Sequence, residues 1–585
     1  MSFNETLQTL LKSDPRFVDQ DGDLLKSEVI DKAWKIDRQL IGLLLDNAQI
    51  KAKFFDEIKG HWVFNINTFI DYVQDKNFYA SSYTKFRNKI GLTIDGKYLK
   101  ERGEVALVWP YKDCVLEGGQ SKEEEKRKEI FFNEVLAQDE IDRLLDPKVL
   151  SNFKRYTVKG EEPVNEIKRD KDGTIRENLI IKGNNLLALH SLKKQFQGKV
   201  KLIYIDPPFN TGGDSFNYND SFMHSTWLTF MKNRLLIAKE MLTNDGNIFI
   251  HIDINESHYL KVLCDEVYDR ENFVEEIIWA YGSPSGGRAA GAKPVNIHDY
   301  ILHYAKQYQL RKQNKIFTPY SKKYIADWFK YKDNDGRLYQ KRMRGRDQEG
   351  NVQWEKQYLD ESKGLPLTTV WTDIKQVYAD PRAYKENQSE HAELIKGFPT
   401  QKPERLIQRI IEMASEVGDI IMDFQLGSGT TASVAHKIGR QYIGVEQLDY
   451  GKDDSVIRLQ KVIKGDKTGI SKEIKWTGGG DFIYCELMKY NEAFIERIRD
   501  AEDTDTILSI WEEMKARSFL NYNVDIKKMD ENIAEFRELS LSKQKDVLLD
   551  ILNKNQLYVN LSEIEDNDFK VSEEDKRLNR LFYGE

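Results

Sequence analysis

Asp206-Pro207-Pro208-Phe209 places a carboxylate, a stiff turn and a flat apolar ring within four residues. The prolines fix φ and have no N–H group, so the turn is rigid and its carbonyl oxygens stay available as acceptors. A planar ring that bears an amino group fits this set, because the carboxylate and a prolyl carbonyl accept its N–H groups while the ring stacks on Phe209. The competing interpretation is a proline-rich turn around a buried phenylalanine.

The motif follows residues 200–205, whose apolar character predicts a β-strand. Ligands of open α/β sheets bind at the carboxyl ends of strands, so this position favours the chemical interpretation. A DNA base would have to leave its duplex stack to reach the motif, at a cost of a few kcal/mol. Stacking on an aromatic ring returns roughly 1–3 kcal/mol of that cost.

A second set of residues, Asp423-Phe424-Gln425-Leu426-Gly427-Ser428-Gly429-Thr430-Thr431, follows a predicted strand over residues 420–424. Its glycines allow a tight turn and a close approach to a ligand, and a helix is predicted from Thr430. The next predicted strand, 441–446, ends in Glu446, at a spacing that suits a ribose diol. The sequence has no GxxxxGK[ST] loop for a triphosphate. This segment therefore predicts a site for a nucleoside cofactor.

Short apolar strands that alternate with helices must position both sets of residues. The expected strands are 179–181, 200–205, 247–252, 420–424 and 441–446, and the expected helices are 186–196, 227–242, 402–416 and 430–438. This alternation predicts a mainly parallel sheet covered on both faces, in the α/β class. Residues 156–174 are predicted to form a linker or a short hairpin. A capping box at Ser121 and Glu124 predicts a helix through residue 144.

The bulk composition describes an ordinary soluble protein of several domains. Its 585 residues are 40% hydrophobic and 31% charged, with a net charge of −8. No apolar run reaches the ~20 residues of a membrane span, no signal peptide is recognisable, and the three cysteines form no CxxC pair. We therefore expect a cytoplasmic protein without a zinc knuckle, disulfide scaffold or membrane association. His251, His298 and His303 have no metal-ligand spacing, so no metal site is predicted.

Positive charge concentrates between Lys306 and Arg346, where thirteen Lys or Arg residues face three Asp residues, a local excess of ten. Aromatic residues are interleaved with them. Such a run fits nucleic acid, because cationic side chains neutralise phosphates and Arg also reads guanine edges. A basic hairpin that is simply solvated is the alternative. The predicted DNA contacts are Arg337, Lys341, Arg342, Arg344 and Arg346.

A third motif, Phe398-Pro399-Thr400-Gln401-Lys402-Pro403, stands before the helix expected at 402–416. The order DPPF, FPTQKP and DFQLGSGTT, with a large insertion between the first two, resembles the β-class amino methyltransferases. The segments 111–119, 129–146, 178–186 and 478–486 resemble the modification subunits of type III restriction–modification systems. In that family a catalytic half precedes a cofactor half, and a DNA-recognition domain lies between them.

The resemblance implies a Rossmann-like methyltransferase core that uses S-adenosylmethionine. Its boundaries would be a mostly helical N-terminal region at 1–155, the catalytic half at 156–280, the target-recognition insertion at 281–395, the cofactor half at 396–480 and a helical C-terminal region at 481–585.

The resemblance also implies roles for individual residues. The target base would be held by Asp206, Pro207, Pro208 and Phe209. The methionine part of the cofactor would be held by the glycine loop, the ribose by Glu446, and the pocket closed by the TQK motif; the implied cofactor residues are Asp423, Phe424, Gly427, Gly429, Thr430, Glu446, Thr400, Lys402 and Asn184. Two residues depart from the family pattern: Asn184 stands where relatives often have Asp beside the cofactor's adenine, and Gln425 replaces a residue that is commonly apolar or aromatic.

The implied reaction is methylation of adenine N6 in double-stranded DNA. Asp rather than Ser at the first motif position favours adenine over the N4 amine of cytosine within the family. Methylation at cytosine C5 needs a thiolate that usually follows a proline, whereas Asp113, Leu263 and Tyr484 precede the three cysteines. An RNA substrate fits the family less well. The target sequence cannot be read from the chain.

The chain has no P-loop for a translocation motor and no recognisable nuclease motif, so it is not expected to cleave DNA alone. The resemblance further implies a homodimer that associates with a separate ATP-driven restriction subunit. Two alternatives remain open here. One is a solitary adenine methyltransferase, and the other is a catalytically silent DNA-recognition subunit. The helical flanks are the expected surfaces for self-association and for the partner.

Overall fold

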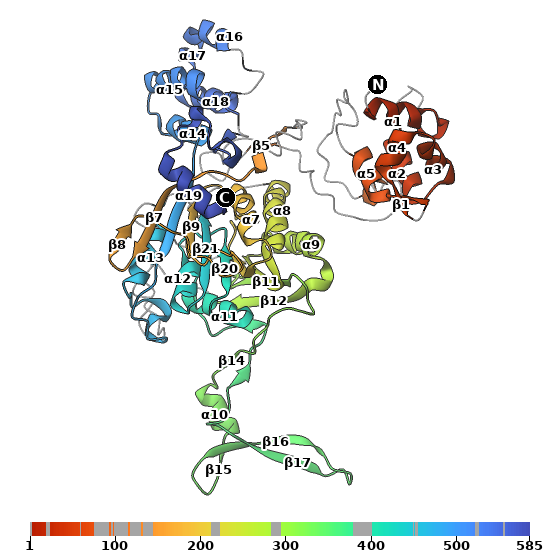
Figure 1. Ribbon diagram of the computed structural model, residues 1–585. Helices are drawn as coiled ribbons and strands as arrows, with labels where there is room; N and C mark the ends of the chain where they lie inside the picture. Colours follow the sequence, from red (N-terminus) through yellow and green to blue (C-terminus); the bar gives the residue numbers. More distant parts are fainter. Residues whose placement is uncertain are drawn as a thin grey trace. The chain divides into compact units, whose positions relative to one another are not determined.

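The computed structural model describes residues 3–18, 24–58, 60–74, 93–94, 97–98, 115–117, 130–132, 144–211, 223–281, 294–377, 401–448, 450, 454–520, 524, 526–553 and 556–584. The chain divides into two compact units (Figure 1). Unit 1 comprises Met1–Glu117 and Ile130–Leu136, and unit 2 comprises Gly118–Glu129 and Ala137–Glu585.

Unit 1 is a small helical assembly around a core of apolar side chains. Its helices are α1 (Phe3–Lys12), η1 (Pro15–Phe17), α2 (Lys26–Trp34), α3 (Arg38–Leu45), α4 (Ala48–Phe54) and α5 (Ile66–Gln74). Asp37 and Asn47 start α3 and α4, since their side chains accept N–H groups of the first turn. Three hairpin pairs complete its described part: β1 (Phe55–Ile58) with β2 (His61–Phe64), β3 (Thr93–Ile94) with β4 (Lys97–Tyr98), and β5 (Val115–Glu117) with β6 (Ile130–Phe132).

The helix predicted to run from Ser121 through residue 144 is wrong at Ile130–Phe132. These residues form β6, which pairs antiparallel with β5. A short apolar run fits a helix face and a strand equally well, and here a partner strand decides between them. Residues 121–129 and 133–143 of that prediction lie outside the described residues.

Unit 2 is built on one sheet, which among the described residues has eleven strands in the order β19-β12-β13-β11-β10-β20-β21-β9-β22-β7-β8. The run from β11 to β22 is parallel throughout, which confirms the predicted mainly parallel α/β sheet. The parallel strands are β9 (Leu179–Lys182), β10 (Val200–Ile205), β11 (Leu242–Ile252), β20 (Ile420–Asp423), β21 (Gln441–Glu446) and β22 (Phe482–Leu487). Strands β10 and β21 have the predicted bounds.

Helices cover both faces of this sheet. The first series of connections leads from β9 through α7 (Asn185–Phe196) to β10, and then through α8 (His224–Met241) to β11. The second leads from β20 through α12 (Thr430–Lys437) to β21, and then through α13 (Ser455–Ile463) to β22. These two series progress toward opposite edges, so right-handed crossovers place their helices on opposite faces. The remaining helices of this part are α9 (Ser257–Tyr268), η5 (Arg270–Asn272), α11 (Glu404–Ala414) and η9 (Gly469–Lys472).

The order of the strands reverses between β10 and β20. In doubly wound sheets this switch point leaves a crevice at the carboxyl ends of the two strands. The Asp206 motif follows β10 and the glycine loop follows β20, so the fold brings the two sets of residues together.

The segment between the two halves contains regular structure in its described part. It holds β13 (His298–Ala305), which pairs with β11 and with β12 (Phe273–Ala280), and β19 (Val370–Trp371), which pairs with β12. The remaining elements are β14 (Phe317–Thr318), α10 (Lys322–Trp328), β15 (Tyr331–Lys332), β16 (Leu338–Arg346), β17 (Val352–Tyr358) and β18 (Leu365–Pro366). The predicted domain boundaries remain predictions, but β13 and β19 belong to the central sheet although they lie within 281–395.

The C-terminal region also contributes to the sheet. β22 lies between β9 and β7 (Leu150–Thr157), and β7 forms a hairpin with β8 (Gly160–Glu162). The region expected to be helical, 481–585, therefore begins with a strand of the central sheet. Helices follow: α14 (Asn491–Asp500), α15 (Thr504–Arg517), α16 (Ile526–Glu531), α17 (Ile533–Glu538), α18 (Leu541–Ile551), η11 (Leu561–Glu563), η12 (Asn567–Phe569) and α19 (Glu573–Tyr583). Within the described parts of the chain, no helix has the length and apolarity needed to cross a bilayer.

Candidate active site

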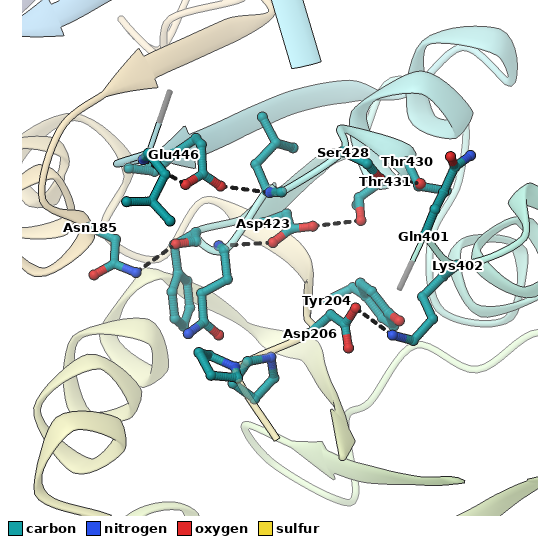
Figure 2. A pocket seen from close by; sticks show the side chains of 18 of the residues that line it. Asn185, Tyr204, Asp206, Gln401, Lys402, Asp423, Ser428, Thr430, Thr431 and Glu446 are labelled. Carbon is teal, nitrogen blue, oxygen red and sulfur yellow. Dashed lines mark hydrogen bonds and ion pairs between the residues drawn. The ribbon is translucent and has the colours of Figure 1, made fainter. Parts of the chain in front are cut away.

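A pocket lies at the switch point, and both predicted sets of residues line it (Figure 2). The predicted site residues in its wall are Asp206, Pro207, Pro208, Phe209, Lys402, Asp423, Phe424, Gly427, Thr430 and Glu446. All of them belong to unit 2. Thr400 lies outside the described residues, and neither Asn184 nor Gly429 lines this pocket.

The two carboxylate oxygens of Asp206 have different surroundings. Oδ2 accepts a hydrogen bond from Lys402 Nζ at 2.6 Å, and Figure 2 shows these two side chains pointing toward one another. Oδ1 is buried and has no hydrogen-bond partner among the described residues. A buried acceptor without a donor costs free energy, so Oδ1 is suited to an N–H group of a ligand.

The rest of the DPPF turn is fixed from two sides. The Pro208 carbonyl accepts a hydrogen bond from Trp227 Nε1 of α8 at 2.8 Å. Phe209 stacks on His251 of β11, with ring centroids 5.8 Å apart and planes inclined by 25°. Lys402 Nζ lies 4.9 Å from the centroid of the same phenyl ring. The turn is therefore held rigidly before any ligand binds, as a positioning site requires.

His251 belongs to a buried polar network beneath Phe209. Its Nδ1 lies 3.0 Å from the hydroxyl of Tyr204 and its Nε2 lies 3.0 Å from Asp299 Oδ2. Tyr281 donates a hydrogen bond to the other oxygen of Asp299 at 3.3 Å. Both imidazole nitrogens thus have partners, which fixes the plane of the ring on which Phe209 stacks.

Asn210, directly after the motif, has a φ of +57°. Few residues other than glycine adopt this left-handed conformation, although Asn tolerates it better than most. Its side-chain amide donates to Glu256 Oε1 at 2.6 Å, and His224 Nδ1 contacts the same oxygen at 2.6 Å. Glu256 is fully buried, and burial raises the pKa of its carboxyl. The residue that follows the DPPF motif is therefore strained, and the buried carboxyl group of Glu256 holds its side chain in place.

The glycine loop is bound to the end of β21. Glu446 Oε2 accepts the N–H group of Gly427 at 2.7 Å, and Oε1 accepts those of Gln447 and Leu448, both at 2.9 Å. Gly427 has a φ of +50° and Gly429 a φ of +75°, so both need the freedom of glycine. A Cβ atom at Gly429 would also lie 2.9 Å from the side chain of Ser455. Gly429 therefore shapes the loop without lining the pocket.

Asp423 is a buried carboxyl in the middle of the pocket. It accepts the N–H group of Gln425 at 3.0 Å and the hydroxyl of Thr431 at 2.6 Å. Burial is the main cause that raises the pKa of Asp423, to about 7, and the nearby charges of Asp206 and Glu446 add to it. A cation bound beside these three carboxyls would lower that pKa again. The described residues contain no group of three or more possible metal ligands.

Asn184 and its neighbour Asn185 have different surroundings. Asn184 caps α7, since its side-chain oxygen accepts the N–H groups of Leu186 and Leu187. Asn185 lines the pocket instead and donates to the Phe424 carbonyl at 2.9 Å. An Asn directly before a helix is a typical N-cap, but the helix predicted from residue 186 would place Asn185 at that position, whereas α7 starts one residue earlier.

Other wall residues were not predicted from the sequence. Tyr204 lies in the strand before the motif, where its ring looks like core, and Ser428 and Thr431 carry hydroxyls within the glycine loop. Gln425, predicted to depart from the family pattern, also lines the pocket. Arg458 links this wall to helix α11, because it donates to Thr430 Oγ1 at 2.7 Å and to Glu404 at 2.9 Å.

The predicted DNA-binding residues lie on or beside β16, the middle strand of a three-stranded sheet with β15 and β17 (Figure 1). Beyond its pairing with β15, at Leu338 and Tyr339, β16 continues with β17 alone as a two-stranded ribbon. Lys341, Arg342, Arg344 and Arg346 are exposed on β16. Arg337 stands before this strand and forms ion pairs with Asp360, at 2.7 Å, and Glu361. These two acidic residues neutralise the charge of Arg337 within the protein. Arg337 therefore differs from the exposed cations of β16.

Comparison with known proteins agrees with the class that this fold and site define. A family model described as DNA methylase matches residues 200–455, which contain the pocket-lining motifs. A second model, described as type III restriction/modification enzyme methylation subunit, matches residues 37–92. The chain is therefore a methylase that acts on DNA.

Individual relatives narrow the class. A Haemophilus influenzae chain named as the HindVI Mod subunit of a type III restriction-modification enzyme is 36% identical, over 99% of this chain and 98% of its own. The EcoP15I Mod subunit of Escherichia coli is 28% identical over 53% of this chain and 64% of its own. This chain belongs to the family of Mod subunits of type III restriction–modification enzymes.

Solved structures add no further argument. The M1.HpyAVI–SAM complex aligns with 48% of this chain and 99% of its own at 17% identity and a TM-score of 0.28. PvuII DNA methyltransferase (cytosine-N4-specific) aligns with 49% of this chain and 94% of its own at 14% identity and a TM-score of 0.30. Scores this low support no statement about this chain.

Proposed function

We propose that this chain transfers the methyl group of S-adenosylmethionine to the N6 amine of an adenine that has left its duplex, at a specific site in double-stranded DNA. One observation carries the proposal. The Asp206 turn and the Asp423 loop follow neighbouring parallel strands and line one pocket, so a base site and a cofactor site share a wall. The type III family membership gives the reaction its setting as protective methylation in a restriction system.

The wall residues fit S-adenosylmethionine, whose ammonium and sulfonium groups are cations. Asp423 is a buried carboxyl of raised pKa, which a cation would stabilise in its charged form. The methionine end would be held or shaped by residues of the glycine loop: Asp423, Phe424, Gly427, Gly429 and Thr430. Glu446 would accept hydrogen bonds from the ribose hydroxyls. Lys402 and Thr400 would close the pocket, with Asn184 beside the adenine ring. When bound, the cofactor supplies an electrophilic methyl group.

The DPPF turn would prepare the base. The N6 lone pair of adenine is delocalised into its ring, so the amine is a poor nucleophile. Asp206 Oδ1 and the Pro207 carbonyl would accept the two N–H groups and favour a tetrahedral nitrogen, which frees the lone pair. Phe209 would stack on the ring and hold it in line. Catalysis then rests on positioning and electrostatics, and not on a covalent intermediate.

Lys402 keeps a separate role in this arrangement. Its ammonium group occupies Asp206 Oδ2 and leaves Oδ1 for the base. The ion pair also fixes the orientation of the Asp206 carboxylate in the pocket. A single carboxylate thereby joins the base site to the motif that closes the cofactor site.

The exposed cations of β16 would neutralise phosphates or contact base edges of the duplex. They are Lys341, Arg342, Arg344 and Arg346. Arg337 has the least support as a DNA contact, because Asp360 and Glu361 already neutralise it. For assembly we propose a homodimer and a separate ATP-driven restriction subunit, as the type III family implies. The helical regions outside the sheet, in unit 1 and in α14–α18, are the proposed contact surfaces.

Two measurements test the proposal. Purified protein with tritium-labelled S-adenosylmethionine and duplex DNA should incorporate label into the DNA, and hydrolysis of the product should yield N6-methyladenine. Single-molecule sequencing of DNA from cells that express the chain should then give the motif and the strand. DNA without label, or label in cytosine, would contradict the proposal.

A further inference from the structure

We propose that the ribbon formed by β16 and β17 contacts bases in the DNA major groove through an apolar pair, Met343 and Trp354. This inference rests on the proposed function and deepens it, because it assigns base contact to residues outside the basic run. The register of the ribbon, its exposure and its charges carry the argument.

The two residues are direct cross-strand partners. Met343 pairs with Trp354 in the antiparallel register, just before an irregularity between Met343 and Gly345. Trp354 is 61% exposed and Met343 54% exposed, both unusually high for such large apolar side chains. Side chains of direct partners lie on the same face of a ribbon, so the pair forms one apolar patch.

At this point neither face of the ribbon is packed against other residues that the structure describes. Residues 341–344 on one strand and 353–356 on the other are exposed without interruption. Successive side chains of a strand point to opposite faces, so this exposure applies to both faces. A two-stranded ribbon of this kind is about the size that the major groove admits, since that groove is roughly 12 Å wide.

The charges around the patch favour an anionic partner. Lys341 pairs directly with Lys356, on the same face as Met343 and Trp354. Like charges in direct register are unfavourable unless something compensates them. Asp333 pairs with Lys356 at 3.1 Å, and Lys341 lies 4.9 Å from the centroid of the Tyr331 ring. DNA phosphates on both sides of the groove would further neutralise the positive charge of this face.

The opposite face of the ribbon and the turn between its strands indicate which part of the ribbon enters the groove. Arg342 lies on the other face and is exposed, and arginine side chains form hydrogen bonds with base edges. The turn that joins the strands carries Asp347 and Glu349, which phosphates would repel. The middle of the ribbon, and not its turn, is therefore the part that enters the groove, where Trp354 and Met343 meet apolar base surfaces such as thymine methyl groups.

Trp354→Ala in the full-length protein tests the inference. The probes are a duplex with the methylation motif found by sequencing and an unrelated duplex of equal length. We expect affinity for the first to fall about tenfold, with unchanged affinity for the second. The slope of log affinity against log salt should not change, because the variant neutralises as many phosphates as the wild type. Met343→Ala should act in the same direction, and Trp354→Phe should retain most of the affinity.

Trp328→Ala is the matched control, since Trp328 is 56% exposed in α10 of the same insertion and should not affect either duplex. Unchanged affinity of S-adenosylmethionine verifies that the variants are folded. Retained affinity of both Trp354→Ala and Met343→Ala for the motif, or an equal loss on both duplexes, would overturn the inference alone. A wild-type protein that methylates no DNA would overturn the proposed function first.

Discussion

The unequal surroundings of the two Asp206 oxygens give the carboxylate a defined direction before the base arrives. Lys402 holds Oδ2, and Oδ1 remains a buried acceptor without a partner among the described residues. A donor on the bound base would satisfy Oδ1. The free energy of this hydrogen bond is therefore available for base binding.

Asp206→Ala should lower methyl transfer at least about a hundredfold, because it removes an acceptor aimed at the reacting amine. Affinity for S-adenosylmethionine, measured by calorimetry, should change little. Asp206→Asn is the matched variant, since it keeps an acceptor oxygen but loses the charge and the ion pair with Lys402. Turnover close to that of the wild type in the Ala variant would rule out the proposed role.

Cofactor binding should depend on pH through Asp423. Its pKa of about 7 in the free protein means that the carboxyl becomes protonated as the pH falls below that value. Only the charged form attracts the cationic cofactor, so affinity should weaken as the pH falls from about 8 to 6, and binding near pH 7 should release a proton.

Calorimetry in buffers of different ionisation enthalpy measures that proton. Asp423→Asn should bind more weakly and lose the pH dependence in this range. Burial also raises the pKa of Glu446, and a pH dependence that survives in the Asn variant would assign the effect to that residue.

His251→Gln should reduce turnover about tenfold, because it disturbs the ring on which Phe209 stacks. His303→Gln is the matched control: His303 is also buried in this sheet and stacks on Phe249, away from the DPPF turn. Both variants should lose stability, and only the first should weaken the fluorescence increase of 2-aminopurine placed at the target base. Equal turnover in the two variants would show that the network is merely structural.

At the level of elements, the sequence predicted the centre of the sheet better than its edges. Strands such as 200–205 and 441–446 are buried on both faces, so an uninterrupted apolar run marks them. β7 and β13 are antiparallel additions that depend on partners distant in the chain, β22 and β11, and local pattern does not identify such partners.

The site was predictable wherever a motif follows a central strand. The DPPF turn, Asp423 and Glu446 all belong to such positions and line the pocket. Tyr204 and Asn185 could not be recognised, because their types at these positions also suit a core strand and a helix start. The ion pair between Lys402 and Asp206 was also missed, since it joins residues of different motifs.

Replacing Arg342, Arg344 and Arg346 together with Ala should weaken DNA binding and lower the salt slope by about one for each phosphate that is no longer neutralised. Arg337→Ala should leave the slope unchanged, because its charge is already neutralised by two acidic residues. The measurement is the affinity for duplex DNA over a series of salt concentrations. An unchanged slope in the triple variant would show that this run is a solvated face.

For the whole molecule, the central sheet changes the design of an assembly experiment. A truncation after Gly480 would remove β22 and α19, and α19 binds β7 through Asn579, whose side chain hydrogen-bonds the backbone of Leu150. Loss of dimerisation in such a variant would report unfolding. Unit 1 contributes no strand to the sheet among the described residues, so its removal is the cleaner test.

We expect the full chain to be a homodimer at micromolar concentration, as measured by light scattering. A variant without residues 1–117 should still bind S-adenosylmethionine, because the pocket belongs entirely to unit 2. The mass of this variant then locates the dimer contact. A monomer assigns the contact to unit 1, and a dimer assigns it to the C-terminal helices. A monomeric full chain with complete methylation activity would contradict the assembly proposal and leave the chemistry intact.

The position of β9 in the sheet has a consequence for how the chain is made. β9 is translated early, yet its two neighbours are Gln441–Glu446 and Phe482–Leu487, so both of its edges stay unpaired while most of unit 2 is still being synthesised. Unpaired strand edges are sites of aggregation in growing chains. We therefore expect ribosome-bound chains that stop before Leu487 to require chaperone protection, and the methylase to become soluble only when its last central strand has emerged.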